Sequence, residues 1–216
     1  MTIYTISSSN DITFKYLSAL IWFSFQRLLS LIAILFLMPL FILVAILIKI
    51  ESQGPVIFVQ TRVGLKGRSF SIYKFRTMRM KSDPKYKEPT MHDSDREGIC
   101  KKFKSDPRVT FMGHVLRKTS IDELPQLFNV ILGNMALVGP RPALLNEVTD
   151  YDSYMLERLE SMPGITGLWQ VSGRANTTFE EQIQLDIKYV REQSLSLDIQ
   201  ILLATIPAVL FAKGAY

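Results

Sequence analysis

The sequence has few side chains that bind metals or form disulfides. Among its 216 residues are one cysteine, Cys100, and two histidines, His92 and His114. A single cysteine excludes both a disulfide framework and a zinc site built from several cysteines. It favours a reduced, cytosolic environment. The histidines are far apart in the chain, so we expect no histidine-based metal site.

Charge is absent between Arg27 and Lys49, and residues 28–48 are almost all Leu, Ile, Ala, Val, Phe or Met. As a helix this run is roughly 30 Å long, which is the thickness of the hydrocarbon core of a bilayer. It is too long and starts too late for a signal peptide. Pro39 removes a backbone N–H in its middle. The helix therefore either spans the membrane with a kink or bends back to the face it entered.

Positive charge is concentrated in one part of the chain. Residues 61–118 carry 16 basic and 6 acidic side chains, whereas residues 119–216 carry 6 basic and 12 acidic ones. Such a segment predicts an anionic partner, which can be a phosphate-bearing substrate, lipid headgroups or nucleic acid. The aromatic residues Tyr73 and Phe75 fit a hairpin core as well as base stacking, so we expect no nucleic-acid partner. A non-catalytic, membrane-anchored adaptor that binds anionic lipids is the alternative to an enzyme.

The patterns predict an α+β fold in two parts. Residues 1–50 form the N-terminal segment and membrane-anchoring helix, with a break at Pro39. Residues 51–216 form a mainly helical cytosolic domain with interfacial helices, which begins with a β-hairpin over residues 56–60 and 70–75. Residues 79–104 are predicted to be a loop, and the apolar residues 199–212 are too short to span a membrane. Three further segments have helical patterns: 119–134, 144–161 and 177–193.

Two adjacent acids, Asp122 and Glu123, lie just after the basic pair that begins at Arg117. Ser120 and Glu123 match a capping box, but Pro125 is best tolerated in a first helical turn, so we prefer Asp122 as the helix N-cap. A helix N-terminus favours ionised carboxylates and also binds phosphate. An ionised carboxylate with basic neighbours suits covalent catalysis on a phosphoryl group, with Mg²⁺ bridging the two anions. Acidic residues are also common as simple caps, so the spacing alone leaves both interpretations open.

Nine motifs in a fixed order carry a family resemblance. The chain resembles the monotopic phosphoglycosyl transferases, bacterial sugar transferases that start polysaccharide or glycoconjugate synthesis, from about Arg27 to Tyr216. The motifs are GPVIF (54–58), QTRVG (60–64), YKFRTM (73–78), DPRVT (106–110), LRKTSIDELPQ (116–126), NV (129–130), VGPRP (138–142), PGITG (163–167) and GR (173–174).

The resemblance implies a reaction and a site. A UDP-sugar donates its sugar-1-phosphate to a membrane polyprenyl phosphate, typically undecaprenyl phosphate, and UMP leaves. Asp122 matches the family nucleophile and is also our metal-ligand candidate for Mg²⁺. Glu123 matches its partner and Arg117 matches a phosphate-binding arginine. By position, we expect the polar wall of the site to contain Lys74, Arg76, Arg141, Arg174 and Asp186.

The resemblance also implies a place in the cell, which is the bacterial inner membrane, with the catalytic domain on the cytoplasmic face among the membrane lipids. The family's membrane helix is re-entrant and broken at a Ser-Pro pair. Here Met38 precedes Pro39, which leaves the topology open. The ending at residues 214–216 is similar to members that transfer glucose or galactose phosphate. The sequence does not settle the oligomeric state, for which a homodimer is one option.

Overall fold

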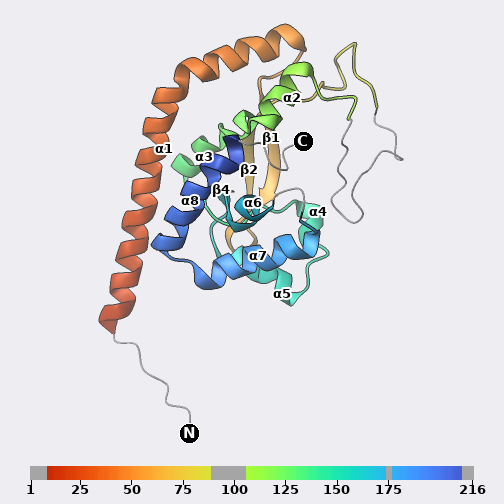
Figure 1. The fold of residues 1–216 in the computed structure, drawn as a ribbon. Coiled ribbons are helices and arrows are strands. Elements are labelled where there is room, and N and C mark those ends of the chain that lie inside the picture. Colours follow the sequence, from red (N-terminus) through yellow and green to blue (C-terminus); the bar gives the residue numbers. More distant parts are fainter. Residues whose placement is uncertain (1–8, 89–105, 174–176, 211–216) are drawn as a thin grey trace.

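The computed structural model describes the backbone of residues 9–88, 106–173 and 177–210. A long N-terminal helix lies along one side of a domain made of two small sheets and several short helices (Figure 1). The predicted α+β fold class is therefore confirmed, including the long apolar helix, the hairpin and the mainly helical remainder.

Helix α1 (Ser9–Glu51) contains the apolar run for which the sequence predicts a membrane anchor. Its stretch Leu17–Glu51 is long and apolar enough to cross a membrane by length and composition. Figure 1 shows that the helix is bent into two legs, and Pro39 lies inside it. Proline lacks the N–H of the helical hydrogen bond and crowds the preceding turn, which is the usual cause of such a bend.

One stripe of α1 is buried against the domain, at positions that recur with helical spacing. The stripe has two polar members, Gln26 and Ser30. The Oε1 atom of Gln26 accepts a hydrogen bond from the backbone N–H of Leu137 at 2.7 Å. Outside the stripe, the Nε1 atom of Trp22 donates to Oδ2 of Asp198 at 2.8 Å. The other faces stay apolar and exposed, as they would in contact with lipid. The buried stripe consists of Gln26, Ser30, Ile34, Phe41, Val44 and Ile48.

The first sheet is the predicted hairpin. Strands β1 (Ile57–Val63) and β2 (Ser69–Phe75) are antiparallel and are joined through η1 (Leu65–Gly67). The second sheet was not predicted from the sequence. Its strands β3 (Ala136–Val138) and β4 (Gly164–Thr166) are parallel and have three residues each. Strands this short carry too little alternation to be recognised.

Within the described residues, five further helices of five or more residues lie around these sheets. They are α2 (Phe111–Lys118), α3 (Gln126–Leu132), α6 (Leu168–Ser172), α7 (Phe179–Glu192) and α8 (Leu195–Leu210). Helix α7 has the predicted capping box, since the N–H of Glu181 donates to Oγ1 of Thr178 and the N–H of Thr178 donates back to Glu181. Helix α3 ends at Gly133 as predicted, with a left-handed φ of 79° that suits glycine. Helix α2 was not predicted.

The helix predicted over residues 144–161 is wrong as a single element. The structure has three short pieces there, namely α4 (Leu145–Val148), α5 (Ser153–Leu156) and η4 (Glu157–Glu160). The break comes at Asp152, which is extended and accepts the N–H of Met155 at 2.7 Å. An aspartate that caps a new helix competes with continuation of the previous one.

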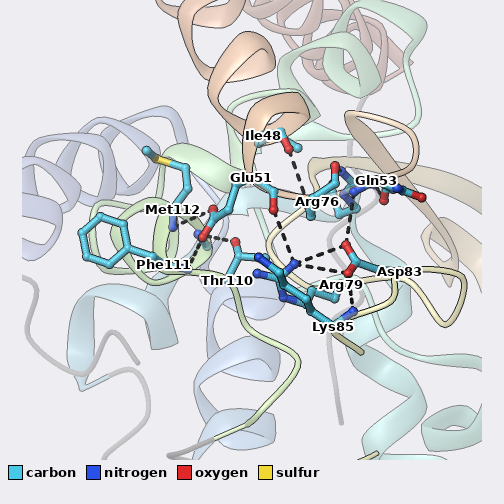
Figure 2. Close-up of polar contacts among 12 residues, drawn as sticks. Ile48, Glu51, Gln53, Arg76, Arg79, Asp83, Lys85, Thr110, Phe111 and Met112 are labelled. Atoms are coloured by element: carbon cyan, nitrogen blue, oxygen red, sulfur yellow. Dashed lines mark hydrogen bonds and ion pairs between the residues drawn. The ribbon is translucent and has the colours of Figure 1, made fainter. Parts of the chain in front are cut away.

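The C-terminal end of α1 is tied to the domain by a cluster of polar contacts (Figure 2). Arg76 donates to the carbonyl oxygens of Ser52 and Gln53 at 2.7 and 2.5 Å, which satisfies groups at the end of the helix. The carboxylate of Glu51 accepts the N–H groups of Phe111 and Met112 at 2.6 and 3.0 Å. The anchor thus caps the N-terminus of α2, the helix that leads into the acidic pair.

Candidate active site

The acidic pair lies in a tight turn between α2 and α3, in η3 (Ile121–Glu123). Ser120 precedes it with a left-handed φ of 57° and makes no side-chain cap. The prediction that Asp122 is the helix N-cap is wrong, because α3 begins at Gln126 with Pro125 as its N-cap. Proline cannot donate the N–H that an earlier helix start would require, so the chain makes a separate 3₁₀ turn first.

Glu123 is held by Lys74 of β2. The Nζ atom of Lys74 donates to Oε1 of Glu123 at 2.5 Å, and both side chains are mostly buried. The hairpin sets this position, because Lys74 pairs with Phe58 across the two strands. A charge-assisted bond between two side chains with little solvent access fixes the orientation of the glutamate next to Asp122.

Asp122 has an unusual electrostatic environment. Burial and the negative charge of Glu123 raise the pKa of Asp122 to about 6, against the opposing attraction of Lys74 and Arg117. Within the described part of the chain, no other residue hydrogen-bonds to its carboxylate. A carboxylate with a raised pKa is ionised at neutral pH yet is more basic than an ordinary aspartate, which suits a nucleophile.

Arg117 supplies the second positive charge beside the pair. It lies in the last turn of α2, and its Nε donates to Oγ1 of Thr77 at 3.0 Å. Its charge lowers the pKa of Asp122, so the two side chains interact electrostatically. The phosphate-binding role that the resemblance implies for Arg117 stays a prediction. Arginine keeps its charge in proteins, so it can bind phosphate at any physiological pH.

A pocket opens next to the acidic pair, between β2, the start of α3 and the turn that follows β3. Three of its lining residues are cationic, namely Arg62, Lys74 and Arg141, and the full lining is Arg62, Ile72, Lys74, Glu123, Gln126, Arg141, Pro142, Gly164, Ile165 and Gln170. Three cations around one pocket favour a polyanionic ligand such as a diphosphate.

Sequence reasoning had not selected Arg62 as a site residue. The side chain is buried, and its Nη1 donates to the carbonyl oxygen of Pro142 at 3.2 Å. It braces the turn that carries Arg141, whose guanidinium stands 5.8 Å from the centroid of the Trp169 ring. The signal was present, because Arg62 belongs to one of the family motifs.

Asp186 lies behind the pocket wall and has no exposed surface. Arg158, itself buried, donates to the Asp186 carboxylate, to the Tyr151 hydroxyl at 2.5 Å and to the backbone oxygen of Arg141 at 3.0 Å. Burial raises the pKa of Asp186 to about 6 against the attraction of Arg158. In this structure Asp186 supports Arg141 through Arg158 and does not line the pocket.

Two further predicted residues, Arg76 and Pro39, lie away from this cluster. Arg76 points to the end of α1 and makes the contacts shown in Figure 2. Arg174 lies outside the described residues, and Pro39 is in the anchor. Of the residues that the structure describes, no three His, Cys, Asp or Glu side chains form a metal cluster. Asp122 and Glu123 are two adjacent carboxylates, and Mg²⁺ in phosphate-handling sites often takes one or two carboxylates together with substrate phosphates.

Comparison with known proteins identifies the family. The model of the bacterial sugar transferase family matches residues 18–212. The chain belongs to this family. The resemblance to phosphoglycosyl transferases that the motifs indicated is therefore confirmed, and the protein is an enzyme of that class.

Three relatives illustrate the range of the family. The chain is 43% identical over 198 residues to an exopolysaccharide production protein, ExoY, of Rhizobium meliloti, covering 89% of this chain and 87% of that one. It is 48% identical over 166 residues to a galactosyl transferase, CpsE, of Streptococcus agalactiae, covering 76% of this chain and 37% of that one. It is 41% identical over 199 residues to a UDP-glucose:undecaprenyl-phosphate glucose-1-phosphate transferase of Xanthomonas campestris, covering 88% of this chain and 39% of that one. The chain thus spans less than two fifths of the last two.

Proposed function

We propose that the protein transfers a sugar-1-phosphate from a UDP-sugar to a membrane polyprenyl phosphate, such as undecaprenyl phosphate, and releases UMP. One observation carries the proposal. Asp122, with a pKa raised to about 6, lies beside Lys74 and Arg117 next to a pocket lined by three cations. The names of the relatives support the donor and acceptor classes, since one acts on UDP-glucose and undecaprenyl phosphate.

Two displacements account for the transfer. A carboxylate oxygen of Asp122 attacks the phosphorus that bears the sugar, and the bond from this phosphorus to the bridging oxygen breaks, so that UMP leaves with the electron pair. An oxygen of the polyprenyl phosphate then attacks the same phosphorus. The bond to Asp122 breaks, and the carboxylate is restored as polyprenyl-diphospho-sugar is released.

The other residues hold the reacting groups. Arg117 and the pocket cations Lys74, Arg62 and Arg141 would bind the phosphate oxygens and offset their repulsion from Asp122. Glu123, fixed by Lys74, would position Asp122 or take part in proton handling. We propose Mg²⁺ as the cofactor, held by Asp122 together with the donor's phosphates, where it would neutralise phosphate charge.

The membrane gives the proposal its setting. The exposed apolar faces of α1 suit lipid, and we propose that the anchor sits in the bacterial inner membrane with the domain on its cytoplasmic face. A lipid phosphate at the headgroup level would then meet the basic part of the domain. A covalent intermediate lets a soluble donor and a lipid acceptor react in turn.

The test is Asp122→Asn, with Asp150→Asn at an exposed position as the matched control. We expect the first variant to lose UMP release from the donor, while the control keeps it. Incubation of the unmodified protein with donor alone should leave a phosphosugar adduct on the peptide that contains Asp122, detected by mass spectrometry. Normal turnover by Asp122→Asn would sink the covalent route and favour the non-catalytic adaptor.

A further inference from the structure

Gln126 has a buried amide at the edge of the candidate pocket. It is the first residue of α3, only 3% of its surface is exposed, and it lines the pocket beside Glu123. None of the residues that the structure describes hydrogen-bonds to its side chain. An amide at a pocket wall that has little contact with water and no hydrogen bond to the protein can be satisfied by a ligand in the pocket.

The chemistry of the amide indicates what that ligand is. A carboxamide has one acceptor oxygen and two N–H donors, whereas phosphate oxygens only accept hydrogen bonds. The pocket already has Arg62, Lys74 and Arg141 for phosphate. A hydroxyl group both donates and accepts, so two neighbouring hydroxyls of a sugar match the carboxamide on both sides.

The position of Gln126 also indicates that its ligand is the sugar part of the donor. It follows the acidic pair within about one helical turn, so the amide lies close to the nucleophile. In an in-line displacement the leaving group departs on the side of the phosphorus opposite to the attacking oxygen. UMP therefore points away from Asp122, whereas the sugar stays bonded to the attacked phosphorus. The group within reach of Gln126 is the sugar.

We infer that Gln126 is a sugar-binding residue whose carboxamide hydrogen-bonds the hydroxyl groups of the transferred sugar. The inference rests on the proposed function and adds the element that recognises the sugar, namely the start of α3. A second pocket amide, Gln170, lies on the other wall, where its Nε2 donates to the carbonyl oxygen of Ile165 at 2.8 Å. The sugar would sit among neutral amides and the diphosphate among the cations.

Gln126→Leu tests this with two probes, a UDP-hexose and UDP itself. We expect kcat/KM for the UDP-hexose to fall about 10- to 100-fold, because one or two hydrogen bonds to the sugar are lost and an apolar group replaces them. Inhibition by UDP, which has no sugar, should stay unchanged. Gln126→Met keeps the length of the side chain, removes both hydrogen-bonding groups and adds no charge, and it should give the same selective loss if the leucine variant folds poorly. Gln182→Leu, a buried glutamine on α7 outside the pocket, is the control.

Monodeoxy analogues of the UDP-hexose locate the contact. With the unmodified protein, removal of the hydroxyl that Gln126 binds should lower kcat/KM, and with Gln126→Leu the same removal should have little further effect. Equal weakening of UDP and UDP-hexose by Gln126→Leu, no change for either, or unchanged deoxy effects would each overturn the inference. Failure of the unmodified protein to turn over any UDP-sugar would overturn the proposed function as well.

Discussion

Acid should slow the first half-reaction through the protonation of Asp122. Its pKa is raised to about 6 by burial and by Glu123, whereas an ordinary aspartate has a pKa of about 3.9. In the proposed mechanism only the ionised carboxylate attacks phosphorus. At pH 5 about one tenth of the molecules would be ionised, so UMP release should fall about tenfold from its value at pH 8. With an ordinary pKa the same change would cost only about a tenth of the rate.

Lys74→Met should move the pH at which UMP release is half-maximal to a higher value. The positive charge of Lys74 favours the ionised form of Asp122 and therefore lowers its pKa. Removal of the charge raises the pKa, and it also leaves the negative charge of Glu123 without its 2.5 Å partner, which acts in the same direction. The acid limb of the profile should shift to higher pH, while Lys74→Arg, which keeps the charge, should shift it less.

The measurement is a single-turnover assay with enzyme in excess over a UDP-sugar and without lipid acceptor, quenched over a pH series and analysed for UMP. The readout is the pH at which the rate is half its maximum. The maximum rate itself is not used, because Lys74 also lines the pocket and its loss can lower that rate at every pH. A rate that is level from pH 8 to pH 5 would refute the electrostatic reasoning. So would a midpoint that Lys74→Met leaves unchanged or moves to lower pH.

Two further predictions concern the anchor. Glu51→Gln should cost about 1 kcal/mol of stability through the weakened cap on α2, and it should raise KM for the donor because α2 carries Arg117. The control is Asp152→Ala, which removes the N-cap of α5. It should lower the melting temperature similarly and leave KM unchanged. The second prediction concerns cysteines placed before Lys15 and after Lys49, with Cys100 replaced by serine. Both should be labelled from the same side of the membrane, because both legs of α1 contact one domain. Labelling from opposite sides would mean that the helix spans the membrane and loses the Trp22–Asp198 and Gln26–Leu137 contacts.

The sequence predicts the elements with strong local signals. The hairpin, the capped α7 and the end of α3 at Gly133 are all observed, since each depends on residues a few positions apart. The contact between Lys74 and Glu123 was not predicted, although the family resemblance placed Lys74 in the polar wall of the site. They are 49 positions apart, and nothing local indicates that they form an ion pair.

Burial changes the electrostatics of the acidic pair in a way that its neighbours in sequence do not reveal. Basic residues before Asp122 and an expected helix N-terminus both suggested a stabilised, readily ionised carboxylate. The structure moves the helix start to Gln126 and buries the aspartate next to Glu123, so its pKa rises. Gln126 was overlooked for the same reason, because its position in the wall of the pocket depends on how the chain folds.

Arg76 shows that the two-residue alternation of a strand cannot be extended past the end of that strand. Lys74 and Arg76 are two positions apart, which would put them on the same face of a continuing strand. Strand β2 ends at Phe75, however, so the alternation no longer applies to the next side chain. Lys74 reaches Glu123, whereas Arg76 reaches the carbonyl oxygens at the end of α1, and Thr77 accepts from Arg117. One short stretch therefore contacts both the anchor and the acidic pair, so a change in how α1 is seated would act directly on the residues around Asp122.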